Sequence, residues 1–179
     1  LNIKDKNKFI NSINFFLNKH LISIIDIKKR NSDFHARFSA KKRIYKYVIV
    51  NRVGALSIDK NKGWLVKKKL NISLMKKGAK LLLGTHDFST FRSSSCNAKS
   101  PIRTLNKLII KKSKDKINLF FESRSFLQQQ VRSMVGSLKY LGQDKWTLKQ
   151  FKKIKESKNR SKCAPPAPAS GLYLLEVKY

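Results

Sequence analysis

One stretch of the chain, residues 34–50 (FHARFSAKKRIYKYVIV), runs from a basic, aromatic segment into a regular alternating pattern. In an extended strand, side chains two positions apart lie on the same face. Arg43, Tyr45 and Tyr47 therefore share one face with Ile49, while the residues between them face the other way. The pattern predicts a β-strand over 43–50, so the chain must supply a sheet to hold it.

This strand begins beside a cluster of cations and rings. Arg37 and two lysines add positive charge next to Phe34, His35 and Phe38. Aromatic rings interleaved with cations suit an unstacked base and its flanking phosphates. The alternative is an edge strand whose tyrosines pack in the protein and whose lysines are solvated. On the strand alone, both interpretations stay open.

The balance of charge favours a polyanionic partner. The chain of 179 residues carries 41 Lys and Arg against 10 Asp and Glu, a formal net charge of +31. Such a field attracts nucleic acid and makes binding depend strongly on salt. Most of the cations are lysines, which an AT-rich genome also produces. The arginines are better indicators of RNA contacts, because the planar guanidinium group can form two parallel hydrogen bonds to a phosphate.

The composition also indicates the cellular compartment of the protein. The two cysteines, Cys96 and Cys163, lie far apart and have no Cys or His neighbour in ligand spacing. They indicate neither a disulfide framework nor a metal site, which fits a reducing cytoplasm. No apolar run approaches the roughly 18 residues of a membrane span, and no signal peptide is visible. We expect a cytoplasmic protein without metal or membrane.

The N-terminal region is predicted to be the end of a domain. Residues 5–20 have helical spacing with Asp5 as a possible N-cap, and 21–27 (LISIIDI) is predicted to be a buried strand. This unit lacks the strand partners needed to stand alone, and the chain begins at Leu1 rather than Met. We therefore expect 1–33 to be the trailing end of an N-terminal domain and 34–179 a C-terminal α/β domain.

The remaining pattern predicts an α+β fold. Asn71 or Ser73 can begin a helix that ends near Gly84. The other predicted elements are a hairpin over 102–112 and 117–122, helices over 125–141 and 146–157, and a strand over 171–179. The helix at 125 is predicted to start with a capping box of Ser125 and Gln128, and the helix at 146 with a capping box of Thr147 and Gln150. Together these predict an antiparallel sheet with helices on one face, in ferredoxin-like or RRM-like halves.

Two further features concern arginines. Residues 84–105 are predicted to form a long loop, which Phe88 and Phe91 anchor while Arg92 and Arg103 point outward. The alternative is a plain surface loop.

In the 125–141 helix, Arg132 lies well off the apolar stripe and near Gly136, and a mid-helix glycine costs about 1 kcal/mol relative to alanine. We therefore expect another element to approach this helix face closely.

Four blocks, in order, resemble the TruA family of tRNA pseudouridine synthases. They are ARFSA with R-x-Y-x-Y, GTHDFSTFR with a later SPIR, VRSMVG, and CAPPAPAS with GLYLLEVKY. The resemblance implies a tRNA-modifying isomerase that converts uridine to pseudouridine at positions 38–40 of the anticodon stem-loop. It also implies no cofactor, no metal, and a homodimer that binds tRNA across both subunits.

The resemblance also implies roles for particular residues. Tyr45 would pack on the target base, and Arg132 would support the catalytic aspartate. Candidates for contacts with RNA are Arg37, Arg43, Arg92 and Arg103. The family's aspartate lies in an R-T-D-x-G-V-H-A segment that this chain lacks, so we expect no catalytic aspartate here. We expect the nucleophile to lie upstream of Leu1 and residues 1–179 alone to be inactive.

A second hypothesis is a non-catalytic basic RNA-binding α/β module, which the composition fits equally well. The two hypotheses differ in geometry. A synthase of this family requires Tyr45 and Arg132, which are far apart in the sequence, to line one hollow.

Overall fold

The computed structural model describes residues 5–179 and forms two compact units. Their junction lies between Ser39 and Ala40, a few residues beyond the boundary predicted after residue 33. Each unit is described below by itself.

The first unit holds a capped helix, as predicted. Helix α1 (Lys6–Leu17) is followed by a 3-10 turn, η1 (Asn18–His20). The side chain of Asp5 accepts a hydrogen bond from the backbone N–H of Lys8 at 3.0 Å, so the predicted N-cap is confirmed.

The prediction of a strand over residues 21–27 is wrong, because these residues form no strand. Instead, the amide of Asn14 bonds to both backbone groups of Ile24: its Nδ2 donates to the carbonyl at 2.9 Å, and its Oδ1 accepts from the N–H at 2.7 Å. An apolar run becomes a strand only when a neighbouring strand takes up its backbone hydrogen bonds. In this unit, the side chain of Asn14 takes up the backbone hydrogen bonds of one residue, Ile24.

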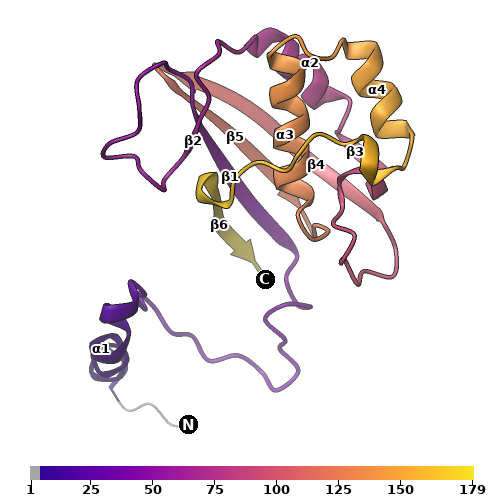
Figure 1. Cartoon of the computed structure of the whole chain (residues 1–179). Helices are drawn as coiled ribbons and strands as arrows, with labels where there is room; N and C mark the ends of the chain where they lie inside the picture. The colour runs from indigo at the N-terminus through magenta and orange to yellow at the C-terminus, as the bar shows by residue number, and fades with distance from the viewer. Residues whose placement is uncertain (1–4) are drawn as a thin grey trace. The chain divides into compact units, whose positions relative to one another are not determined.

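The second unit is built on a six-stranded sheet (Figure 1). Its strands are β1 (Lys42–Val50), β2 (Trp64–Leu65), β3 (Gly84–Asp87), β4 (Ile102–Ser113), β5 (Lys116–Ser123) and β6 (Leu172–Lys178). The order is β2-β1-β5-β4-β3, with β6 also paired to β1. All pairs are antiparallel except the short β1–β2 pair. The predicted strand, hairpin and closing strand are confirmed, whereas β3 falls in the predicted loop.

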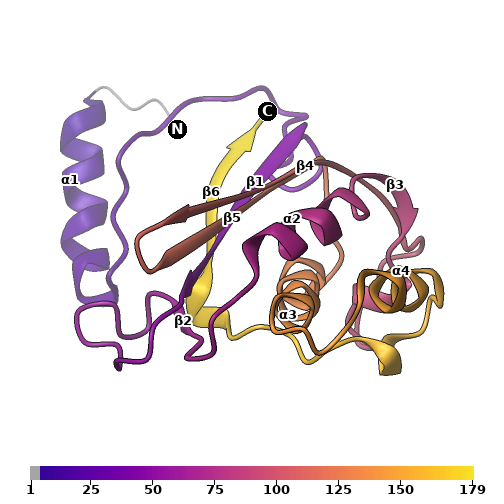
Figure 2. The ribbon, with the colours of Figure 1, turned by 90° about the horizontal axis from the view of Figure 1, so that it is seen from above.

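Three helices cover one face of this sheet: α2 (Ile72–Lys80), α3 (Gln130–Gly142) and α4 (Leu148–Glu156) (Figure 2). The apolar stripe of α3, with Met134, Leu138 and Leu141, is fully buried in the core together with Phe121 of β5. The predicted α+β class, with helices on one face of a mainly antiparallel sheet, is confirmed. No helix of the described residues is long and apolar enough to cross a lipid bilayer.

In the second unit, two of the three predicted helix starts are confirmed. Asn71 caps α2, and Thr147 forms a capping box with Gln150 at the start of α4. The predicted start of α3 is wrong: the helix begins at Gln130, not at residue 125, and Gln129 has a left-handed φ of 60°. The side chain of Gln130 turns back to accept a hydrogen bond from the N–H of Leu127 at 2.8 Å. This contact holds residues 124–129 as a loop in front of the helix.

Asn51 fixes the end of the central strand. Its Nδ2 donates to the carbonyls of Val66 (2.7 Å) and Lys68 (2.8 Å), and its Oδ1 accepts from the N–H of Leu70 (3.1 Å). Its own N–H donates to the carbonyl of Asp115 in the β4–β5 turn at 2.7 Å. One amide therefore satisfies three backbone groups of the segment that leads to α2.

We expect Asn51→Ala to lower the free energy of unfolding by about 2–3 kcal/mol, because it leaves these backbone groups without partners. Asn106, which is exposed on β4, is the matched control, and Asn106→Ala should change the value by less than about 0.5 kcal/mol. Urea unfolding of both variants measures the difference. Equal effects would show that the amide of Asn51 does not support the fold.

Candidate active site

A hollow of about 240 Å³ opens where β1, β6 and the start of α3 meet. It is lined by Tyr45 on β1, Leu172 on β6, and residues 126–132, which run through the loop in front of α3 into its first turn. The structure thus brings together Tyr45 and Arg132, the two residues that the sequence analysis singled out. It also adds Phe126, which the sequence analysis did not predict as a site residue.

Tyr45 is held by the sheet on one side and by an aromatic ring on the other. It pairs with Phe121 of β5 and Leu174 of β6, and the β1–β6 register shifts between Ile44 and Tyr45. A bulge of this kind re-aims a side chain at the edge of a sheet. The half-buried ring meets Phe126 edge to face, with centroids 5.2 Å apart and planes at 87°. This contact fixes the ring at the wall of the hollow.

Two hydrogen bonds join Arg132 to Ala167, one through the side chain of Arg132 and one through its backbone carbonyl. Its Nε donates a hydrogen bond to the carbonyl of Ala167 at 2.6 Å, and the N–H of Ala167 donates to the carbonyl of Arg132 at 3.0 Å. Within the described residues, the two terminal nitrogens of the guanidinium have no hydrogen-bond partner. The fork is therefore oriented through Nε while its outer nitrogens can pair with another group.

Ala167 belongs to a proline-rich segment, residues 164–171 (APPAPASG), which we call the strap. The strap lies against α3 at Gly136, where a Cβ atom would stand 2.1 Å from the carbonyl oxygen of Pro165. Only a residue without a side chain allows this approach. The expectation that another element would approach this helix face closely is confirmed.

Tyr47 holds the far end of the strap. Its hydroxyl donates to the carbonyl of Pro168 at 2.7 Å, and Gly171 lies so close to its ring that a Cβ would be 2.7 Å from Cζ. Burial raises the pKa of the Tyr47 phenol, against a smaller opposing effect of the Arg132 charge. The phenol therefore stays protonated and remains a hydrogen-bond donor. Apart from the glycine at 136, no feature of the sequence predicted these contacts.

None of the other arginine candidates of the second unit is among the described residues that line the hollow. Arg43, the second residue of β1, donates to the carbonyl of Arg124, just before the loop that lines the hollow. Arg37 lies in the first unit, where its guanidinium stands over the ring of Phe38, so it is not placed relative to the hollow.

Arg92 and Arg103 hold the loop that follows β3. Arg92 donates to the carbonyl of Ala98 at 3.5 Å, and Arg103 donates to the carbonyl of Ser100 at 3.0 Å. This loop reaches the hollow at one point, where the N–H of Ser93 donates to the carbonyl of Gln128 at 3.0 Å. Both arginines support a loop beside the hollow, and their contact with RNA stays a prediction.

Among the described residues, none that lines the hollow carries a carboxylate. Asp87 is occupied elsewhere, since it accepts from the N–H of Ser89 at 2.8 Å at the end of β3. Burial by itself would raise the pKa of Asp87, but the hydrogen bonds from Ser89 and the charges of Lys158 and Arg92 together lower it, so Asp87 stays ionised as a loop-fixing group. The hollow therefore presents a guanidinium and aromatic rings without an acid of its own.

Comparison with known proteins decides the family. The sequence model of a family described as tRNA pseudouridine synthase matches residues 79–179. The chain is 59% identical over 177 residues to tRNA pseudouridine synthase A of Pelagibacter ubique, which covers 99% of this chain and 72% of that relative. The chain belongs to the tRNA pseudouridine synthase family.

More distant members of this synthase family agree. The chain is 43% identical over 168 residues to tRNA pseudouridine synthase A of Parvibaculum lavamentivorans, covering 94% of the chain and 68% of the relative. It is 43% identical over 169 residues to the protein of that name in Ehrlichia canis, covering 94% and 69%. Arg132, Gly136 and the strap all lie within the residues that match the synthase family model.

We expect Gly136→Ala to lower the free energy of unfolding by about 1–3 kcal/mol, although alanine favours a helix. The reason is the collision of its Cβ with the Pro165 carbonyl. Gly54→Ala is the matched control, because nothing lies within 4 Å of a Cβ there, and it should be close to neutral. Thermal unfolding measures both. A Gly136→Ala protein as stable as the wild type would contradict the close contact between α3 and the strap.

Proposed function

We propose that the protein is a tRNA pseudouridine synthase, and that the hollow at Tyr45 and Arg132 is its half of the active site on this unit. The observation that carries the proposal is the meeting of these two residues in one hollow, in a chain that belongs to the synthase family. The function requires a uridine to leave its stack and enter a pocket. A hollow of about 240 Å³ with an aromatic wall suits a pyrimidine base.

The reaction is an isomerisation, as the family resemblance implies. A carboxylate attacks the target nucleoside, the glycosidic bond breaks, the uracil turns, and a carbon–carbon bond to the ribose replaces the carbon–nitrogen bond. Every atom of the uridine is retained, so the proposal requires no cofactor. The ring of Tyr45 would support the base while it is detached and turning.

Arg132 would act on the carboxylate. A guanidinium within hydrogen-bond reach favours the charged form of an acid and fixes its direction by two parallel bonds. Its outer nitrogens have no hydrogen-bond partner among the described residues, while Nε is fixed by Ala167. Because no acid lines the hollow, the proposal requires a carboxylate from outside the lining residues. We propose the aspartate of the family's R-T-D-x-G segment.

The charge and the family also support proposals for the RNA substrate, the oligomeric state and the compartment. A net charge of +31 favours tRNA, and Arg37, Arg43, Arg92 and Arg103 are our candidates for phosphate contacts. We propose that the target is the anticodon stem-loop, that the enzyme acts as a homodimer, and that it works in the cytoplasm. The alternative, a non-catalytic RNA-binding module, predicts binding of tRNA without turnover.

We expect Arg132→Lys to lower kcat by about 100-fold with little change in the affinity for tRNA, since lysine keeps the charge but loses the planar fork. Arg52→Lys is the matched control, because Arg52 pairs with Asp115 at 2.9 Å in the β4–β5 turn, and its kcat should stay near wild type. Pseudouridine formation in tRNA by the full-length protein measures both. Equal kcat values for wild type and Arg132→Lys would remove Arg132 from the reaction.

We expect Tyr45→Ala to lower kcat/KM by about tenfold or more, because the base loses its stacking partner. Tyr45→Phe keeps the ring and its contact with Phe126 and should recover most of the activity. The same assay measures both variants. Unchanged turnover in Tyr45→Ala would take the ring out of the active site.

A further inference from the structure

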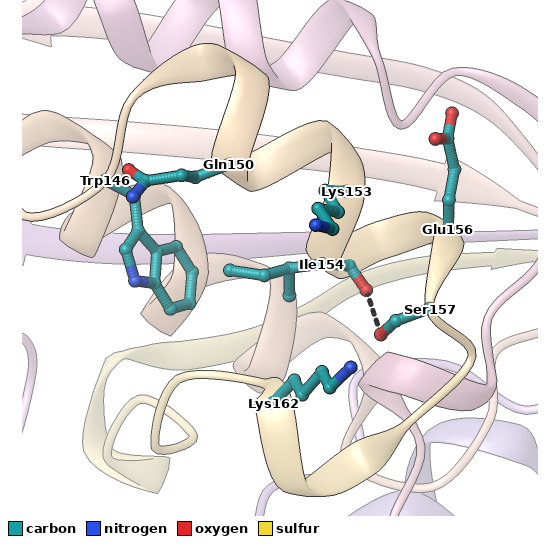
Figure 3. Close-up of a pocket in the computed structure, with 7 residues that line it drawn as sticks. All are labelled: Trp146, Gln150, Lys153, Ile154, Glu156, Ser157 and Lys162. Atoms are coloured by element: carbon teal, nitrogen blue, oxygen red, sulfur yellow. Dashed lines mark hydrogen bonds between the residues drawn. The ribbon is translucent and has the colours of Figure 1, made fainter.

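A second hollow, of about 420 Å³, lies on the helical side of the sheet. It is enclosed by α4, by Trp146 just before it, and by the 3-10 turn η3 (Arg160–Lys162) (Figure 3). Its volume falls in the range of sites that hold small organic groups. It shares no residue with the hollow at Tyr45 and Arg132.

Trp146 and Ile154 form an apolar part of the lining of this hollow. In Figure 3 the side chain of Ile154 points toward the indole of Trp146. The indole also packs on Tyr140, with ring centroids 5.1 Å apart and planes at 51°, so it is held in place. A fixed indole beside an aliphatic side chain can pack against the face of a planar group.

The rim of the hollow is positively charged. Lys153 and Lys162 line it, and no ion pair within residues 5–179 involves either side chain. Glu156, the one acidic residue of the lining, extends away from Trp146 in Figure 3. The hydroxyl of Ser157 is occupied, since it donates to the carbonyl of Ile154 at 2.7 Å. The site therefore offers an aromatic platform with two ammonium groups.

We propose that this hollow binds an unstacked nucleotide of the tRNA substrate, outside the uridine that is modified. The inference rests on the proposed function for the presence of tRNA. The base packs on Trp146 and Ile154, and Lys153 and Lys162 contact its flanking phosphates. Stacking on an aromatic side chain beside cations is how proteins hold single-stranded nucleic acid, and the platform tolerates any base because every base has a π-face.

The position of the hollow suits a second contact on the same RNA. Lys162 is five residues before Ala167, which hydrogen-bonds Arg132. Five residues span at most about 18 Å. Nucleotides that stay stacked advance about 3.4 Å along one strand, so some five of them bridge this distance. A tRNA whose uridine lies beside Arg132 can thus place a nearby phosphate at Lys162.

Charge removal tests the proposal through affinity. In the full-length protein, Lys153→Gln with Lys162→Gln should weaken tRNA binding about tenfold and reduce the slope of log K against log salt by about 1.4, for two lost phosphate contacts. The matched control is Lys76→Gln with Lys77→Gln on α2, two exposed lysines that carry the same charge, and it should change the affinity less than threefold. Equal losses in the two pairs would overturn the proposal.

Fluorescence tests the platform directly. Residues 1–179 have two tryptophans, Trp64 and Trp146, and the emission of Trp146 is the difference between Trp64→Phe and the double variant Trp64→Phe with Trp146→Phe. Saturating tRNA should quench its emission, and the Lys153→Gln and Lys162→Gln pair should need about tenfold more tRNA for the same quench. Unchanged emission at saturating tRNA would overturn the proposal. Failure of the wild type to bind tRNA would instead overturn the proposed function.

Discussion

The paired hydrogen bonds between Arg132 and Ala167 are the constraint on which the site depends. They join the first turns of α3 to the strap, and the strap in turn is held by the hydroxyl of Tyr47 and by contact with Gly136. A guanidinium on a free side chain would adopt many rotamers. Bound through Nε to a backbone carbonyl, it presents its outer nitrogens in one direction, which is the preorganisation that electrostatic catalysis requires.

The fold explains why these groups meet. Strand β1 runs through the middle of the sheet and carries Tyr45 near its start and Tyr47 one step further on the same face. Helix α3 packs its apolar stripe on that face, which brings Arg132 to the level of both tyrosines. The strap crosses α3 at Gly136 and leads into β6, which returns along β1. The site is thus assembled from three segments that rigid elements hold in register.

Much of this arrangement was predictable from the sequence, and the exceptions have physical reasons. Alternation in β1 and the cap at Thr147 are local signals, and the structure confirms them. Residues 21–27 form no strand because apolar character does not supply a partner. The predicted start of α3 was wrong because the side chain of Gln130, and not that of Ser125, accepts a backbone hydrogen bond there, from the N–H of Leu127. The bond from Arg132 to Ala167 joins distant segments, and only Gly136 hinted at it.

The most direct test of this account is a crystal structure of the full-length protein bound to tRNA. The account predicts that the target uridine is flipped out against the ring of Tyr45, with an aspartate on the outer nitrogens of Arg132 and the bond from Nε to Ala167 intact. A target uridine bound away from this hollow, or an Arg132 guanidinium turned to solvent in the complex, would contradict it.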